Sequence, residues 1–209
     1  MSGESGIHGK VARYYSKRLR EFGPQARGVD WNSEESQRLR FQKLLYIAEE
    51  TAARSILDYG CGYGALVETL ERHEPKIERY QGYDIATAMI EQARVLHSSR
   101  QWAVFTDVQE DLARADVVVA SGIFNVRLDC GVEEWEAYIA RTLDDMRALA
   151  VLGMAFNMLT AYADRERMRT DLYYADPHKY FDLCRERYSR NVALLHDYDL
   201  YEFTIGVRL

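Results

Sequence analysis

The sequence predicts an α/β fold in which helices cover both faces of a mostly parallel sheet. Short apolar segments alternate with helical segments from residue 55 to about residue 158, an order typical of parallel strands joined by helical crossovers. The run from Asp116 to Ala120 is rich in valine, as expected of a strand buried on both faces. Two apolar segments near the C-terminus are joined by a short link, which permits only an antiparallel hairpin. A chain of 209 residues is long enough for one such domain.

The N-terminal part is predicted to be helical. Residues 8–22 have the pattern of a basic amphipathic helix, and a turn over residues 28–32 follows it. Ser33 is placed as the N-cap of a second helix that runs to about residue 53. We therefore divide the single domain into an N-terminal helical segment, residues 1–54, and an α/β core, residues 55–209.

Strand and helix patterns then alternate through the core. Apolar runs and helical periodicity define its elements, and a proline at the first helical position marks the last helix. The predicted strands are residues 55–59, 79–83, 102–105, 116–120, about 152–158, 191–195 and 201–207. The predicted helices are residues 62–73, 86–98, about 132–149 and one that begins at Asp176-Pro177.

Composition and charge argue against several classes of function. The net charge of −6 does not favour nucleic-acid binding, which usually needs a basic face. The three cysteines lie far apart without ligand spacing, so we expect neither disulfides nor a metal site. The first residues have no signal-like apolar region, and no apolar run approaches the ~20 residues of a membrane helix. We expect a soluble cytoplasmic protein, either a monomer or a homodimer.

A glycine-rich loop follows the first predicted strand, within residues 58–64. Gly60, Gly62 and Gly64 allow the backbone to turn sharply and a ligand to approach it closely. Glycine spacing alone does not separate NAD from S-adenosylmethionine (SAM). Asp58 separates them, because a carboxylate at this position repels a pyrophosphate and favours the cationic amine of a methionine moiety. The loop therefore indicates SAM, with a strand-end aspartate that caps its own loop as the alternative.

Acidic residues after the second and third strands extend this site. Asp84 lies about 20 residues after Gly64, close to the spacing of a ribose-binding acid, and its carboxylate can accept from both ribose hydroxyls. A helix N-cap is the alternative role of Asp84. Asp107 could accept from the adenine amino group, although aspartate is common in loops.

The segment after the fourth strand contains small residues. Ser121 and Gly122 leave space beside a sulfonium, and Phe124 could pack on the cofactor or on the acceptor. Ordinary packing between strand and loop is the alternative.

These four elements, in this order and at this spacing, resemble the class I SAM-dependent methyltransferases. The glycine loop looks like that family's first motif, and the resemblance covers about residues 37–209. It implies a Rossmann-like sheet of seven strands whose last strand is antiparallel. It assigns to the cofactor Asp58, Gly60, Cys61, Gly62, Gly64, Asp84, Ile85, Met89, Thr106, Asp107, Val108, Ser121 and Gly122.

The N-terminal segment resembles the helical lid of small bacterial methyltransferases in this class. Residues 28–31, followed by Gln37, Arg40 and Phe41, carry the likeness. A lid would bring Tyr14, Gln37 and Arg40 to SAM, with Arg40 on the methionine carboxylate. The alternative places Tyr14 in the core and Arg40 on the surface.

The motifs identify the cofactor but not the methyl acceptor. Methyl transfer needs alignment in a dry site, and a base only where the acceptor holds a proton. The chain has residues 121–124 where many methyltransferases of nucleic-acid bases and glutamine carry Asn/Asp-Pro-Pro-Tyr/Phe, so those substrates are less favoured. His196, in the predicted hairpin turn, is the candidate base, with a structural role as the alternative. Candidate acceptor-binding residues are Phe124, Asn125, Arg127, Asn157, Tyr173, Tyr174 and Tyr198.

The sequence therefore predicts a SAM-dependent methyltransferase that acts on an oxygen or nitrogen of a small molecule. Two alternatives stay open: a SAM-binding protein without catalysis, and an NAD(P)-linked oxidoreductase, against which Asp58 argues.

Overall fold

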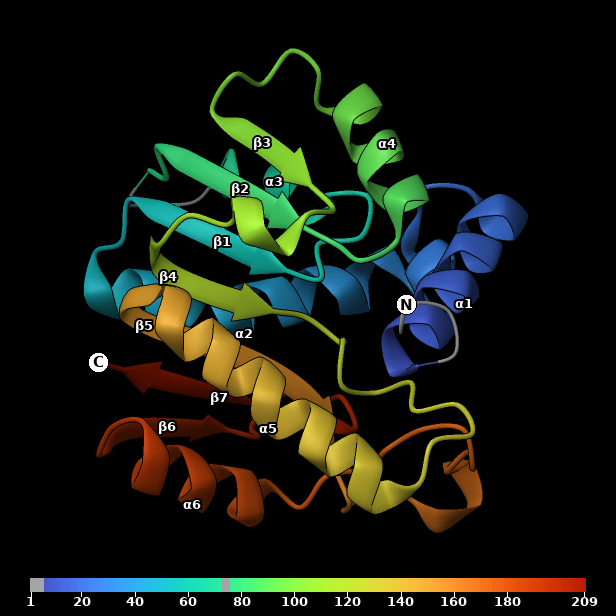
Figure 1. Cartoon of the computed structure of the whole chain (residues 1–209). Coiled ribbons are helices and arrows are strands. Elements are labelled where there is room, and N and C mark those ends of the chain that lie inside the picture. Colours follow the sequence, from blue (N-terminus) through green and yellow to red (C-terminus); the bar gives the residue numbers. More distant parts are fainter. Residues whose placement is uncertain (1–5, 73–75) are drawn as a thin grey trace.

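A seven-stranded sheet forms the centre of the computed structural model, which describes residues 6–72 and 76–209 (Figure 1). Its strand order is β3-β2-β1-β4-β5-β7-β6. The strands are β1 (Ser55–Tyr59), β2 (Arg79–Tyr83), β3 (Ala103–Thr106), β4 (Ala115–Ala120), β5 (Ala150–Leu159), β6 (Asn191–Leu195) and β7 (Glu202–Arg208). Neighbours from β3 to β5 pair in parallel, whereas β7 pairs antiparallel with both β5 and β6. The mostly parallel sheet with an antiparallel last strand is confirmed.

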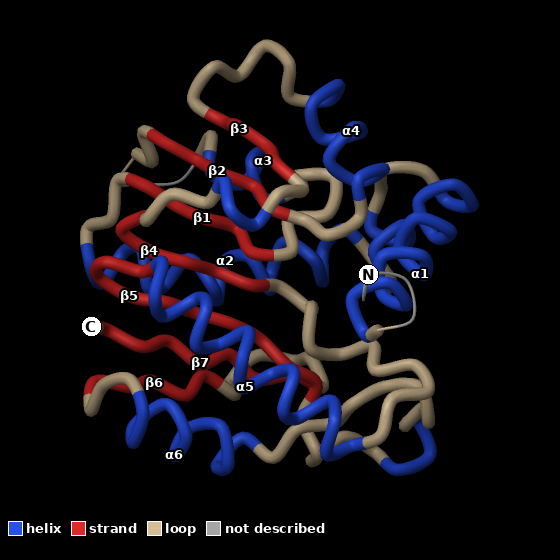
Figure 2. Tube along the Cα trace, viewed as in Figure 1, coloured by secondary structure: helices blue, strands red, loops and turns tan. Residues whose placement is uncertain are grey.

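Helices pack on both faces of this sheet, as Figure 2 shows. The helices are α1 (Ile7–Phe22), α2 (Glu34–Thr51), α3 (Leu66–Leu70), α4 (Thr87–Leu96), α5 (Val132–Leu149) and α6 (Pro177–Arg187). Short 3-10 turns are η1 (Ala26–Val29), η2 (Gln109–Asp111) and η3 (Arg165–Arg167).

The central strands divide their side chains between two apolar cores. In β4, Val117 and Val119 belong to the core shared with α2, α3 and α4. Val118 and Ala120 point the other way, into the core shared with α5 and α6. All four are fully buried, as the valine run predicts for a strand covered on both faces.

The second N-terminal helix is part of this packing. α2 begins at Glu34 because Oγ of Ser33 accepts a hydrogen bond from the amide of Ser36 at 3.1 Å, which confirms the predicted N-cap. Leu44 and Ile47 are then buried against the sheet. α2 therefore covers one sheet face, while α1 occupies a different place.

α1 lies at the edge where the parallel strands end, as Figure 1 shows. Val11 packs in the core that contains Tyr59 of β1 and Tyr83 of β2. Farther along α1, Leu19 packs with Tyr63 of the glycine loop. This edge is where open α/β sheets bind their ligands, so α1 covers the expected position of a site.

The helix predicted over residues 62–73 begins later than expected, and that part of the prediction was wrong. Gly62 and Gly64 have φ angles of 55° and 81°, in the left-handed region, which a right-handed helix does not contain. Only after these glycines does α3 start, at Leu66. The predicted end at His73 lies outside the described residues.

Within residues 6–72 and 76–209, no helix combines the length and the apolar character needed to cross a membrane.

Candidate functional site

The glycine loop after β1 forms the sharp turn that its sequence predicts. Gly60 has a φ angle of 87°, and a Cβ atom there would lie 2.2 Å from Cγ2 of Ile123. A Cβ atom on Gly62 would lie 3.2 Å from Cγ1 of Val29. Gly60 therefore provides both a left-handed backbone and close approach to the loop after β4.

The amide groups of this loop already have partners within the protein. The N–H groups of Gly60 and Cys61 both donate to the carbonyl of Tyr83, at 2.7 and 2.9 Å. The N–H group of Gly62 donates to Oδ2 of Asp84 at 2.9 Å. A phosphate-binding loop instead points its amides at the ligand. These three amides are thus committed to the fold and not to a pyrophosphate.

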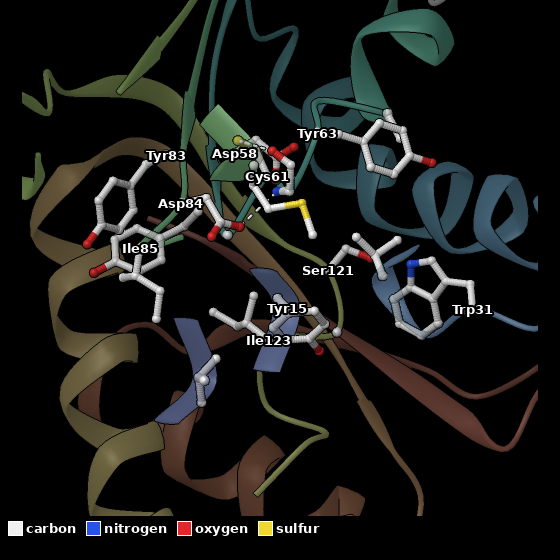
Figure 3. A pocket seen from close by; sticks show the side chains of 18 of the residues that line it. Tyr15, Trp31, Asp58, Cys61, Tyr63, Tyr83, Asp84, Ile85, Ser121 and Ile123 are labelled. Atoms are coloured by element: carbon white, nitrogen blue, oxygen red, sulfur yellow. Dashed lines mark hydrogen bonds between the residues drawn. The ribbon is translucent and has the colours of Figure 1, made fainter. Parts of the chain in front are cut away.

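A cavity lies between the glycine loop, α1 and the loop after β4 (Figure 3). Its volume is about 820 Å³ when the space at the open mouth is included. Two carboxyl groups, Asp58 and Asp84, line it. Its aromatic lining consists of Tyr15, Trp31, Phe41, Tyr59, Tyr63, Tyr83 and Tyr138. The cavity therefore combines an acidic wall with aromatic surfaces.

Asp58 is a buried carboxyl group near the end of β1, only 3% exposed. Burial raises its pKa to about 7; the hydrogen bond from the Tyr80 hydroxyl, at 2.8 Å, opposes this shift, and the nearby charge of Asp84 adds to it. A cation in the cavity would favour the ionised form of Asp58. The state of this group is therefore sensitive to the charge of a ligand.

Asp84 follows β2 and holds two backbone segments. Its Oδ2 accepts from the amide of Gly62, and its Oδ1 accepts from the amide of Ala86 at 2.8 Å, just before α4. Burial raises the pKa of Asp84 to about 6, although these amide bonds lower it. The carboxylate lines the cavity, as the ribose role requires, and ties the glycine loop to the residue before α4. The N-cap of α4 is Ala86, so the alternative role of Asp84 as that N-cap is wrong.

The loop after β4 forms another part of the wall, with Ser121 and Gly122. Gly122 has a φ angle of 74°, and its N–H group donates to Oδ1 of Asn157 at 2.7 Å. A Cβ atom on Gly122 would lie 2.4 Å from both Cη2 and Cζ2 of Trp31. Glycine at this position therefore lets the indole pack closely against the loop.

Most of the residues assigned to the cofactor by resemblance come together in this cavity. Those that line it are Asp58, Gly60, Cys61, Gly62, Asp84, Ile85, Met89, Ser121 and Gly122, together with Gln37 of the expected lid. Those that do not line it are Gly64, Thr106, Asp107, Val108, Tyr14 and Arg40.

The residues after β3 lie outside the cavity. Oδ2 of Asp107 accepts from the hydroxyl of Thr87 at 2.6 Å, and Oγ1 of Thr106 accepts from the amide of Val108. A Cβ atom on Gly64 would meet rings that pack beneath the loop. An adenine contact from Asp107 stays a prediction.

The two predicted lid contacts have other partners. The hydroxyl of Tyr14 donates to Asp30, and Nε and Nη2 of Arg40 each lie 2.7 Å from a carboxylate oxygen of Glu202. Arg40 is 6% exposed, so the surface position considered for it is wrong. Its guanidinium lies over Trp31, with Cζ 4.0 Å from the ring centroid. Arg40 therefore contacts a ring that lines the cavity.

The polar residues predicted to bind the acceptor hold backbone segments instead. Oδ1 of Asn125 accepts from the amide of Leu159 at 3.0 Å, and Asn157 binds the loop after β4. Arg127 donates to the carbonyls of Cys130 and Thr170, at 2.6 Å each, and to a third carbonyl. None of these three side chains lines the cavity, and the carboxylate-binding role of Arg127 stays a prediction.

The predicted acceptor-side aromatic residues are also outside the cavity. Phe124 is fully buried, and the hydroxyl groups of Tyr173, Tyr174 and Tyr198 have hydrogen-bond partners within the protein. His196 is exposed in the hairpin turn, where it stacks on a tyrosine ring at 5.9 Å between centroids. Its role as a base has no support from this position.

Sequence reasoning missed most of the aromatic lining. Tyr15 lines the cavity while its neighbour Tyr14 does not, because adjacent residues on a helix point about 100° apart. Tyr59 and Tyr83 each adjoin a predicted acidic residue, and this adjacency was the available signal. Trp31 falls in the predicted turn over residues 28–32, but nothing local in the sequence shows that this turn reaches the loop after β4.

Comparison with known proteins identifies the family. Residues 10–188 match the model of a methyltransferase domain. A Mycobacterium tuberculosis protein named as methyltransferase Rv1506c is 51% identical over 154 residues, which cover 74% of this chain and 92% of that protein. The chain belongs to the methyltransferase-domain family.

Solved methyltransferases share the fold. N-methyltransferase NodS from Bradyrhizobium japonicum, in complex with S-adenosyl-L-homocysteine (SAH), superposes with a TM-score of 0.64 at 13% identity, covering 95% of this chain and 97% of NodS. Magnesium protoporphyrin IX methyltransferase from Synechocystis, with bound SAH, gives 0.60 at 13% identity, covering 95% and 98%. At this identity the likeness concerns the fold. The methyltransferase family match itself spans the glycine loop, Asp84 and the loop after β4.

Proposed function

We propose that this protein binds SAM in the cavity beside the glycine loop and transfers its methyl group to an oxygen or nitrogen of a small molecule. One observation carries the proposal. Two carboxyl groups, the buried Asp58 and the half-buried Asp84, line a cavity beside a glycine loop whose amides are already bonded within the protein. Such a site fits a cationic nucleoside and disfavours a phosphorylated one.

The carboxyl groups provide the electrostatic part of this argument. SAM carries an ammonium and a sulfonium, both of which a nearby carboxylate attracts, whereas a dinucleotide brings two phosphate charges that it repels. The usual compensation for phosphate is a set of free loop amides. Because Gly60, Cys61 and Gly62 donate to other groups, that compensation is missing at these residues.

Each wall of the cavity has a proposed role. Asp84 would accept from the ribose hydroxyls, using lone pairs left over from its two amide bonds, and Ile85 would pack on the base. Asp58 would face the methionine ammonium, directly or through water. Ser121 and Gly122 would lie near the sulfonium. Arg40 would reach the methionine carboxylate only through Nη1, for which the described residues provide no partner.

SAM supplies an electrophilic methyl group with a neutral leaving group. The chain has to hold that group in line with the acceptor and exclude water. We propose that α1 and η1 form the lid that excludes water, since Val11, Tyr15 and Val29 line the cavity. α2 packs against the sheet and is not part of this lid.

The acceptor is proposed to be a small molecule. NodS is named as an N-methyltransferase, and the Synechocystis enzyme is named for a magnesium porphyrin, so this fold serves different acceptors. The net charge of −6 supports a small molecule over a nucleic acid. We further propose a cytoplasmic enzyme that acts as a monomer or homodimer.

The test measures binding and turnover separately. Titration with SAM, SAH and NADH should show saturable binding of the first two. Incubation with SAM and a panel of phenols and of primary and secondary amines should then release SAH above the no-acceptor rate for at least one class. Tight SAM binding without SAH release across a broad panel would favour a non-catalytic SAM-binding protein. Binding of NADH in preference to SAM would overturn the proposal.

A further inference from the structure

An indole that lines the cavity is held by a buried ion pair outside it. Trp31 follows η1 in the N-terminal segment, and its ring supports the guanidinium of Arg40 at 4.0 Å. Arg40 forms two hydrogen bonds of 2.7 Å to Glu202, the first residue of β7. The exposed fractions of the two charged side chains are 7% and 1%. Such a planar, two-point pair fixes the guanidinium plane and therefore the ring stacked on it.

The far edge of the same ring meets the loop after β4. The indole carbons Cη2 and Cζ2 are so close to Gly122 that a Cβ atom there would lie 2.4 Å from each. Gly122 is itself fixed by its amide bond to Asn157. The ring therefore has defined contacts with α2 on one face and with the post-β4 loop at its edge, and has little freedom to move.

The position of Trp31 in the cavity gives this arrangement a function. Figure 3 shows Trp31 beside Ser121 on one side and Tyr83 with Ile85 on the other, with Asp84 on the side of Ile85. If Asp84 takes the ribose, the base lies toward Ile85. The methionine and its sulfonium then lie toward Ser121 and Trp31.

We propose that Trp31 forms the wall beside the transferred methyl group and limits the size of the group that fits there. Arg40 and Glu202 act through Trp31 as positioning residues. This inference rests on the proposed SAM site and adds to it the side chain that determines which groups the sulfur and the acceptor can carry.

The test uses cofactor analogues, because it then needs no knowledge of the acceptor. The dissociation constants of SAM and of an analogue with propargyl in place of methyl on sulfur are measured by calorimetry, and their ratio is compared between variants. The wild-type protein should bind the analogue at least tenfold more weakly than SAM. Trp31→Ala should reduce this difference to less than threefold, and Trp31→Phe should restore part of it. A general loss of lid packing would weaken both ligands and leave the ratio unchanged.

Matched variants separate positioning from folding. Trp102→Phe changes a partly buried tryptophan just before β3, outside the cavity, and should leave the ratio of the two dissociation constants as in the wild type. Glu202→Gln keeps side-chain size and Arg40→Lys keeps the charge, while each weakens the planar pair. Both should shift the ratio in the same direction as Trp31→Ala but less. SAH binding should change tryptophan fluorescence in the wild type and in Trp102→Phe, and much less in Trp31→Phe.

A second pair of variants tests the contact with the post-β4 loop. Gly122→Ala should weaken SAM binding in the wild type because the new methyl group displaces the indole. In the Trp31→Ala background the same change should cost several-fold less, since only its backbone strain remains.

A wild-type ratio near one, or a Trp31→Ala ratio equal to that of the wild type, would overturn the role of Trp31 while leaving the SAM site intact. A wild-type protein that binds neither SAM nor SAH would overturn both. SAH distinguishes these outcomes because it lacks the transferred methyl group. Its binding tests the SAM site without testing the wall beside that group.

Discussion

Buried polar side chains occur in two regions at the same edge of the sheet, and they do different work. Near β1 and β2, the buried Asp58 and the half-buried Asp84 line the cavity, and desolvation raises the pKa of each. Near β4 and β5, Asn125 and Asn157 are buried too, but their side-chain oxygens accept from main-chain amides and neither side chain lines the cavity. Position after a strand therefore does not by itself identify a ligand.

The two regions differ in whether their side chains carry a charge that lacks an oppositely charged partner. The carboxyl groups of Asp58 and Asp84 accept hydrogen bonds, but no cationic side chain among residues 6–72 and 76–209 pairs with them, so a ligand can provide a cation. The neutral amides of the second region are satisfied by the backbone, and Arg127 is satisfied by three carbonyls. Changes in the first region should alter binding, and changes in the second should alter stability.

The largest effect is expected in the second region. Arg127→Ala removes a charged donor from three carbonyls and should lower the free energy of unfolding by about 2–4 kcal/mol. Thermal unfolding measures this loss. Calorimetry on the folded variant should show SAH affinity within about twofold of the wild type, as expected for a residue outside the cavity. A folded, stable variant that loses SAH binding would contradict the assignment of Arg127 to a region that stabilises the fold without binding the ligand.

A binding effect of nearly this size is expected in the first region. Asp84→Asn retains the shape but removes the carboxylate, and should weaken SAH binding by roughly 30- to 100-fold, the value of one or two bonds to a charged acceptor. Stability should change little, because the loss of one amide bond is offset by the removal of a partly desolvated charge. Titration of the variant beside Asp107→Asn, its matched control, measures the difference.

Changes of pH should have intermediate effects on both stability and SAM affinity. Both carboxyl groups have raised pKa values, so the folded protein retains protons that the unfolded chain has lost, and its stability without ligand should fall as the pH rises from about 4 to 7. A cation favours the ionised groups, so SAM affinity should rise roughly tenfold from pH 5.5 to 7.5. Calorimetry across this range checks both signs. A flat affinity would mean that neither group faces the ligand's charge.

The smallest effect is expected at Asp107. Its carboxylate is partly exposed and bonded to Thr87, so Asp107→Asn should change SAM affinity by less than about twofold. A larger loss in the same titration would show that the loop after β3 closes on the ligand, and would extend the binding region beyond the cavity walls.

The sequence predicts the fold and the first region well because their signals are local. Gly60, Asp58 and Asp84 lie next to strand ends, where neighbouring residues alone determine their place. The second region depends on tertiary contacts: nothing near Asn157 shows that its side chain turns to Gly122, and nothing near Arg40 reveals Glu202.

The aromatic lining was unpredictable for a similar reason. Which of two adjacent tyrosines on α1 faces the cavity depends on the rotation of that helix over the strand ends. The late start of α3 was equally hidden, because consecutive glycine turns delay a helix that composition alone would begin earlier.

The most direct test of the central claim is a side-by-side calorimetric titration of the purified protein with SAM and with NADH, in two buffers of different ionisation enthalpy. Saturable SAM binding, with proton release at pH 6.5 and no saturable NADH binding, is the result we expect. Preferred binding of NADH, or SAM binding without any proton release, would contradict the assignment of Asp58 and Asp84 to a cationic ligand.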